Sequence, residues 1–172
     1  MKQKLLLLLV PVSIVLLQSC KKEMSQAPES VSPARAMAKM NKAVPIKGSF
    51  TTSAEILQGP PMLRQRVTGL GSSSHLGKAT FVALPTLNLT TPPPFNLSGT
   101  AVFTASNGDE FYTSFTGTAT PNGQGANIVV MTHSITGGTG RFTNASGTII
   151  GNTVGVPGHT EGFITYEGTI KY

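Results

Sequence analysis

Apolar and polar positions alternate through much of the chain after residue 48. In residues 97–105 every second residue is apolar or small, and those between are mostly Ser and Thr. Residues 111–117 repeat the pattern beyond Asn107-Gly108, a dipeptide typical of a two-residue hairpin turn. A period of two indicates a strand with one buried face, so we expect a β-hairpin here. Its core-facing aromatic residues would be Phe103, Phe111 and Phe115.

Six further segments alternate less regularly and are also expected to be strands. They cover residues 46–57, 63–70, 74–84, 127–136, 145–153 and 160–171. Segments rich in Gly, Pro and Asn separate them, as turns require. Eight consecutive strands predict an all-β domain, a single antiparallel eight-stranded barrel, because closure removes exposed sheet edges. The abundant glycines would relieve crowding where strands coil around a barrel. A two-sheet β-sandwich is the alternative.

The N-terminus has a different pattern, which is typical of an export signal. Lys2 and Lys4 precede an uncharged apolar run at residues 5–17. This run is shorter than the ~20 residues that a membrane-spanning helix needs. It ends in Leu17-Gln18-Ser19-Cys20, which resembles the bacterial lipobox. That resemblance implies a signal peptide at residues 1–19, cleavage before Cys20, and a diacylglyceryl group on its thiol.

The cysteine and charge distributions agree with a lipid-anchored protein. Cys20 is the single cysteine, so it cannot form an internal disulfide. Residues 21–47 have a net charge of +4, whereas five basic and five acidic residues cancel over residues 48–172. Basic residues near a membrane favour anionic lipid, and a barrel without a basic stripe argues against nucleic-acid binding. We therefore expect a flexible tether at residues 20–45 and the barrel at residues 46–172.

Two segments resemble a known family. Residues 71–78 (GSSSHLGK) and 135–148 (ITGGTGRFTNASGT) are similar to a group of uncharacterised bacterial secreted proteins. That group looks related to the allene oxide cyclase and dirigent superfamily of small eight-stranded barrels, and the matching spacing extends over most of residues 48–172. The resemblance implies a closed barrel with a central cavity, and relatives with this barrel form dimers or trimers. No catalytic or substrate-binding residue of the plant enzymes aligns with a numbered position here.

The glycine-rich segment at residues 137–141 has two interpretations. Its backbone N–H groups and Arg141 could hold an anion. However, a phosphate loop normally joins a strand to a helix, and this segment is expected to join two strands. Glycine also serves tight connections with positive φ, so we favour a structural role.

The three histidines have no spacing typical of a zinc site, and we predict no metal and no cofactor. We expect strand 74–84 to turn His75 toward the lumen with Phe81. On the last strand, Glu161 and Glu167 share one face, and two carboxylates in a cavity could perform acid–base chemistry. We place them on the outer face, because Ile164, Tyr166 and Ile170 form a better core set.

Three function hypotheses follow. The first is an exported envelope barrel that binds a small apolar or amphipathic ligand, and the second is an isomerase or cyclase of the allene oxide cyclase type. The third is a structural or adhesive envelope protein with a filled lumen. A non-enzymatic role is favoured, because no Gly-x-Ser-x-Gly elbow, cysteine nucleophile or HExxH helix is present. The candidate ligand-binding residues are His75, Phe81, Phe103, Phe111 and Phe115.

The expected location is the bacterial cell envelope, with the membrane as a partner through diacylglyceryl Cys20. Lys21 and Lys22 follow Cys20. They differ from the aspartate that retains lipoproteins in the inner membrane of enteric bacteria. This favours the outer membrane, with the barrel facing the periplasm or the cell surface. The barrel relatives also suggest a homo-oligomer as a partner.

Overall fold

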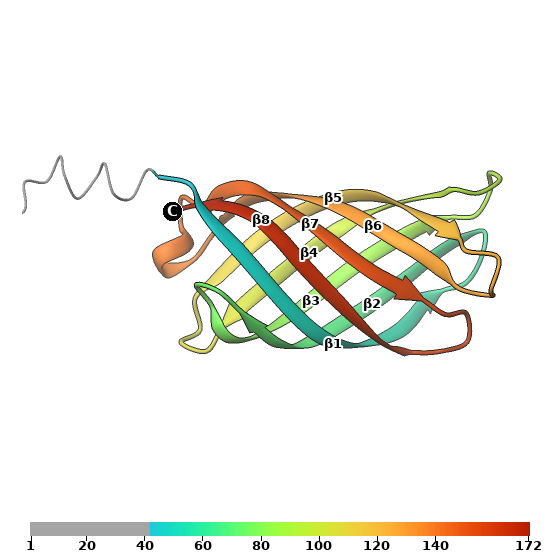
Figure 1. Cartoon of the computed structure of the whole chain (residues 1–172), viewed down its shortest axis with the longest axis horizontal. Helices are drawn as coiled ribbons and strands as arrows, with labels where there is room; N and C mark the ends of the chain where they lie inside the picture. The colour runs from blue at the N-terminus through green and yellow to red at the C-terminus, as the bar shows by residue number, and fades with distance from the viewer. Residues whose placement is uncertain (1–41) are drawn as a thin grey trace, which may run out of the picture. The chain divides into compact units, whose positions relative to one another are not determined.

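A computed structural model describes residues 42–172, which form one closed antiparallel barrel (Figure 1). Each strand pairs with the next in sequence, and β8 closes the barrel against β1. The elements are β1 (Val44–Gln58), β2 (Met62–Ser73), β3 (Gly77–Asn88), β4 (Phe95–Ala105), β5 (Glu110–Pro121), β6 (Asn127–Gly138), the short 3-10 helix η1 (Gly140–Phe142), β7 (Ser146–Gly155) and β8 (Glu161–Lys171). The predicted eight-stranded barrel is confirmed, and the sandwich alternative is wrong.

The signal peptide, Cys20 and most of the expected tether lie outside the described residues. Strand β1 begins at Val44, which pairs with Ile170 of β8. The last two residues of the expected tether therefore belong to the barrel. Residues 42–172 contain no helix that is long and apolar enough to span a bilayer.

Strand alternation determines which side chains enter the barrel. On β8, Ile164, Tyr166 and Ile170 face inward and are buried, whereas Glu161 and Glu167 are exposed. The predicted inward faces of residues 97–105 and 111–117 are also confirmed, because Phe103, Phe111 and Phe115 are all buried. Each strand therefore buries one apolar face, which is the main favourable contribution to folding.

Glycines on the inner face allow the strands to coil tightly, as the sequence suggests. Gly71 of β2 pairs with Phe50 of β1. A Cβ atom at position 71 would overlap the carbonyl oxygen of Ser49 and lie 2.7 Å from the Cα atom of Phe50. Glycine is needed here because two backbones approach more closely than any side chain permits.

The β4–β5 turn is longer than Asn107-Gly108 alone predicts. The Ala105 N–H donates to the Asp109 carbonyl at 2.8 Å, which leaves three residues in the loop. Gly108 occupies the left-handed position with φ +86°, as in three-residue hairpin loops. Asn107 accepts the Asp109 N–H through its side-chain oxygen at 3.2 Å, which stabilises the longer turn. The predicted two-residue turn is therefore wrong in length, although its position is right.

The two halves of the barrel interior are filled differently. Near η1 the core is aromatic and tightly packed, with Phe103 stacked on Phe111 at a centroid distance of 4.7 Å. Phe142 of η1 is fully buried and contacts the Phe111 ring edge-on at 5.7 Å. This end, where β1 begins and the C-terminus lies (Figure 1), is called the closed end below. Towards the opposite end, core side chains such as Val67, Leu87 and Val129 are only partly buried.

Candidate functional site: an apolar cavity with a buried histidine

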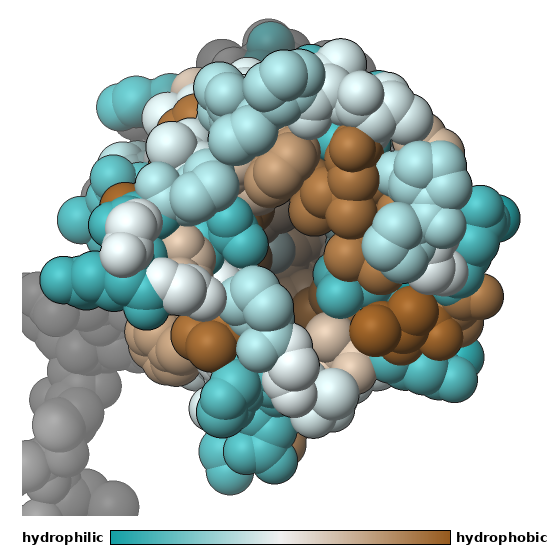
Figure 2. Space-filling view, turned by 90° about the vertical axis from the view of Figure 1, so that its right-hand side faces the viewer, coloured by the Kyte–Doolittle hydropathy of each residue, from teal (hydrophilic) through white to brown (hydrophobic). Residues whose placement is uncertain are grey.

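A cavity of about 630 Å³ enters the barrel at the end opposite η1. Figure 2 views this open end, called the mouth below, and shows a hollow with apolar walls inside a mostly polar rim. The volume lies within the roughly 300–1,000 Å³ typical of small-molecule sites. The barrel can therefore hold one small guest, as other barrels of eight strands do.

The cavity wall is built by the inward positions of the strands near the mouth. Aliphatic side chains dominate it: Val67, Ala83, Leu87, Leu97, Ala119, Val129 and Met131 are examples. Among the residues that the structure describes, no Lys or Arg lines the cavity, and Glu161 is its one carboxylate-bearing residue. Glu161 lies at the start of β8, where it is exposed at the mouth. The wall therefore suits an uncharged, largely apolar ligand.

His133 provides a polar group among these apolar residues. It lies on β6, is fully buried, and lines the cavity. Its Nδ1 atom is 3.0 Å from the Thr113 hydroxyl. Its Nε2 atom is buried and has no hydrogen-bond partner within residues 42–172. The ring packs against Phe115 at 4.6 Å and Tyr166 at 5.2 Å between centroids, so the orientation of His133 is fixed by its neighbours.

Burial controls the protonation of the polar groups around His133. Burial lowers the pKa of His133 from 6.5 to about 4, because the charged imidazolium loses its hydration. Burial also raises the pKa of the Tyr166 hydroxyl above its ordinary value. At neutral pH His133 is therefore an uncharged imidazole and Tyr166 an uncharged phenol. This part of the cavity offers hydrogen bonding without charge.

The structure brings two of the five predicted ligand-binding residues to the cavity. Phe81 and Phe115 line it. Phe103 and Phe111 instead belong to the packed aromatic core and do not reach the cavity. The reason is their position along the barrel, since β4 and β5 place both residues near the turn at the closed end.

The expectation that His75 faces the lumen is wrong. Strand β3 begins at Gly77, and His75 lies on the preceding turn with φ +69°. Its Nε2 atom donates to the Pro45 carbonyl at 2.9 Å, and its Nδ1 atom lies 3.1 Å from the Tyr172 hydroxyl. These contacts hold the imidazole at the closed end, away from the cavity.

His133 was not among the predicted ligand-binding residues, although the sequence contains a signal for it. In β6 the inward positions are Val129, Met131, His133 and Ile135. This alternation places His133 between two apolar core residues, whereas His75 lies next to glycine-rich turn sequence. A histidine in phase with a buried strand face was therefore the better candidate for the lumen.

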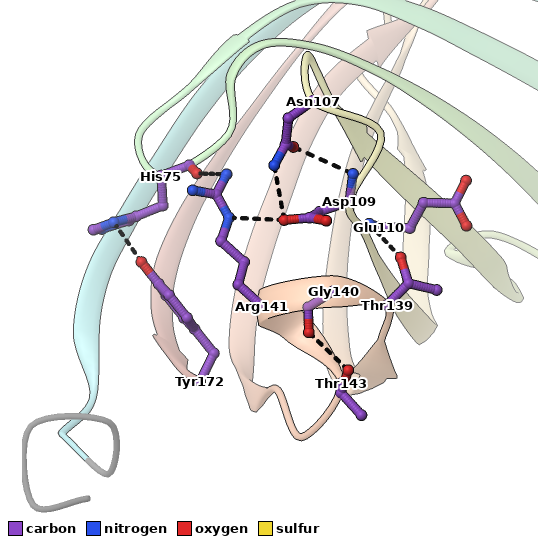
Figure 3. Close-up of polar contacts among 9 residues, drawn as sticks. All are labelled: His75, Asn107, Asp109, Glu110, Thr139, Gly140, Arg141, Thr143 and Tyr172. Atoms are coloured by element: carbon purple, nitrogen blue, oxygen red, sulfur yellow. Dashed lines mark hydrogen bonds and ion pairs between the residues drawn. The ribbon is translucent and has the colours of Figure 1, made fainter. Parts of the chain in front are cut away.

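Arg141 of the glycine-rich segment is engaged in contacts at the closed end (Figure 3). Its guanidinium donates to the His75 carbonyl at 2.6 Å, and its Nε atom lies 3.6 Å from the Asp109 carboxylate. The guanidinium also lies over the Phe142 ring, 4.8 Å from its centroid. The backbone at Gly140 has a positive φ of 52°, a conformation that glycine adopts easily. These contacts support the structural interpretation of residues 137–141.

Replacing Arg141 with alanine is expected to lower the free energy of unfolding by about 1 kcal/mol. The change removes a charge-assisted hydrogen bond and an ion pair that is screened because Arg141 is 42% exposed. Chemical denaturation measures the effect. Arg64→Ala is the matched control, since Arg64 is exposed and has no ion pair within the barrel residues described. Equal losses in the two variants would contradict the assigned role of Arg141.

The histidines do not form a metal site. His75 is on the β2–β3 turn, His133 is inside the barrel, and His159 is on the β7–β8 loop at the mouth. Within residues 42–172, no group of three His, Cys, Asp or Glu side chains is placed to hold a metal ion.

Comparisons with protein families, curated proteins and solved structures find no match to this chain. A barrel fold alone does not determine a function, because one fold supports many activities. The shape and chemistry of the cavity are therefore the features that indicate a function.

Proposed function

We propose that this protein is an exported, lipid-anchored envelope barrel that binds a small apolar or amphipathic molecule in its lumen. The observation that supports this most is the open cavity of about 630 Å³ with predominantly aliphatic walls. A structural or adhesive barrel would be expected to fill its lumen with its own side chains. Here the aromatic core fills the closed end, and the half near the mouth stays open.

The position of the mouth is compatible with an anchor at Cys20. Strand β1 begins at the closed end, where Val44 pairs with Ile170 close to the C-terminus. The preceding segment therefore joins the barrel at the end opposite the mouth. An acylated Cys20 would hold the protein in the envelope, with the outer membrane favoured by Lys21 and Lys22.

An isomerase or cyclase of the allene oxide cyclase type is the second candidate. The buried His133, with Thr113 as a hydrogen-bond partner at 3.0 Å, supports it because a neutral imidazole can act as a base. However, the one carboxylate among the lining residues belongs to Glu161 at the mouth. No acid is therefore paired with His133 in the cavity, and ligand binding is the better-supported function.

Filling the cavity tests the binding proposal. Val129→Trp places an indole on an inward position of β6 that lines the cavity. We expect it to weaken binding of the neutral fluorescent probe N-phenyl-1-naphthylamine at least tenfold, because the indole would occupy the ligand's space. Fluorescence titration of residues 21–172 measures this. The strand pairings and the buried core that the structure describes lie within residues 44–172, so the shortened chain keeps the complete barrel.

Val130→Trp is the matched control, because Val130 is the next residue on β6 and faces outward with 40% exposure. It should bind the probe as the unmodified protein does. Failure of the unmodified protein to bind the probe would contradict the proposed function. Equal binding by the Val129→Trp and Val130→Trp variants would show that any binding occurs outside the cavity.

A further inference from the structure

One buried polar atom in the barrel has no partner. Within residues 42–172, the Nε2 atom of His133 is the only buried side-chain nitrogen or oxygen that makes no hydrogen bond. Buried polar groups in folded proteins are nearly always paired, and an exception calls for an explanation. His133 lines the cavity, so a bound ligand can supply the missing partner.

Among the described residues 42–172, the position of His133 leaves its Nε2 atom without a hydrogen-bond partner. Its other nitrogen is already 3.0 Å from the Thr113 hydroxyl. The ring lies between neighbours on two sides, with Phe115 tilted against it and Tyr166 nearly perpendicular to it at 86°. A flip of the ring would put Cδ2 in place of Nδ1 beside the Thr113 hydroxyl, and the existing hydrogen bond would be lost. This cavity-lining ring therefore keeps one nitrogen without a partner.

The electrostatics of the cavity favour an uncharged ligand group as the hydrogen-bond partner of Nε2. No lysine or arginine among the lining residues could pair with a carboxylate or phosphate, and the imidazole is neutral at pH 7. Burying an ion without a counter-ion is costly. The Glu161 carboxylate at the mouth would also repel an entering anion.

The hydrogen-bonding capacity of Nε2 narrows the choice of polar group further. In a neutral imidazole, Nε2 either donates or accepts, depending on the tautomer. If the Thr113 hydroxyl donates to the Ala101 carbonyl at 3.5 Å, Nδ1 carries the proton and Nε2 accepts. If Thr113 donates to Nδ1, Nε2 donates. A ligand hydroxyl satisfies both cases, because it can donate and accept.

We propose that the cavity binds a neutral amphipathic alcohol that enters with its hydroxyl group first and hydrogen-bonds to Nε2 of His133. The apolar part of the ligand then extends along the aliphatic wall toward the mouth. This inference rests on the proposed function and specifies the ligand class for the same cavity. His133 acts as a specificity-determining residue, since the apolar wall alone would not distinguish an alcohol from other apolar molecules.

Competition between ligands that differ only in the polar group tests the proposal. In this assay, N-phenyl-1-naphthylamine is first bound to residues 21–172, and 1-decanol or decanoate is then added at pH 7.5 to displace it. We expect 1-decanol to displace the probe at a concentration at least tenfold lower than decanoate. Equal or better displacement by decanoate would overturn the inference about a neutral alcohol.

Two variants test whether His133 is responsible for the preference for 1-decanol. His133→Phe keeps an aromatic ring but removes the hydrogen bond, and it should weaken 1-decanol binding about fivefold to tenfold. His133→Gln keeps a polar group that can donate and accept, and it should restore most of the loss. Unchanged 1-decanol binding in His133→Phe would overturn the inference.

NMR of the unmodified protein provides an independent test that does not depend on whether a variant folds. Titration of ¹⁵N-histidine-labelled protein with 1-decanol should shift one imidazole Nε2 resonance, that of the buried His133. No shift at saturating 1-decanol would overturn the inference. If the probe binds and Val129→Trp blocks it while 1-decanol leaves His133 unaffected, the proposed binding function holds and only the alcohol specificity fails. If neither the probe nor 1-decanol binds, both proposals fail.

Discussion

Replacing Gly71 with alanine is expected to lower the free energy of unfolding by about 3 kcal/mol. The added Cβ would overlap the Ser49 carbonyl oxygen and lie 2.7 Å from the Phe50 Cα atom. Both neighbours are backbone atoms of the paired strand β1, so a side-chain rotation cannot relieve the clash. The strands must separate instead, which disturbs the packing of buried Phe50. Overpacking in a close-packed interior typically costs 1–3 kcal/mol, and a backbone clash lies at the upper end.

The matched control for Gly71 is Gly59→Ala. Gly59 is on the β1–β2 loop, and a Cβ there would have no atom within 4 Å. Its effect should stay within about 0.5 kcal/mol, as for other exposed sites. Urea denaturation of both variants measures the difference. A Gly71→Ala variant as stable as Gly59→Ala would contradict the close approach of β1 and β2.

Lowering the pH from 7 to 4 is expected to destabilise the barrel by about 3 kcal/mol through His133 alone. The pKa of this histidine is about 4 in the folded protein because of burial, against an ordinary value of 6.5. The unfolded chain therefore binds a proton that the folded barrel does not, and the contribution falls as the pH drops through 6.5 toward 4. Above pH 6.5 it is fully present. Each unit of pKa difference corresponds to about 1.4 kcal/mol.

His133→Gln isolates this contribution, because glutamine is polar but does not titrate. The pH dependence of unfolding is measured for both proteins between pH 4 and 7.5, and the curves are subtracted. All other titratable groups are the same in both proteins, so their contributions cancel in the difference. A flat difference would mean that His133 is hydrated in the folded protein, which would contradict its burial in an apolar environment.

The sequence was sufficient to predict the architecture. Alternation and turn composition located all eight strands, because each strand has a buried inner face and a solvated outer face. The barrel rather than the sandwich followed from consecutive strands with many glycines, and Gly71 shows why these glycines are needed. Glu167 was placed correctly on the outer face, because the competing face of β8 contains larger apolar residues. Glu161 is exposed as predicted, but its position at the start of β8 also brings it to the mouth of the cavity.

The cavity itself could not be predicted from alternation. Alternation tells which residues face inward, but it does not tell how far along the barrel each lies. Phe103 and Phe81 both face inward, yet only Phe81 borders the cavity, because η1 and Phe142 close the other end. The His75 prediction failed for a related reason. A shift of the start of β3 from residue 74 to Gly77 moved His75 from a strand to a turn.

Native mass spectrometry of the protein purified gently from its own host tests the lipid anchor and the bound ligand in one experiment. We expect a mature chain that begins at acylated Cys20 and retains one small neutral molecule, which extraction with organic solvent then releases and identifies. An intact chain with an uncut signal and an unmodified thiol would contradict the lipid anchor. A mature protein that repeatedly carries no guest, and takes up neither the fluorescent probe nor 1-decanol, would contradict ligand binding in the lumen.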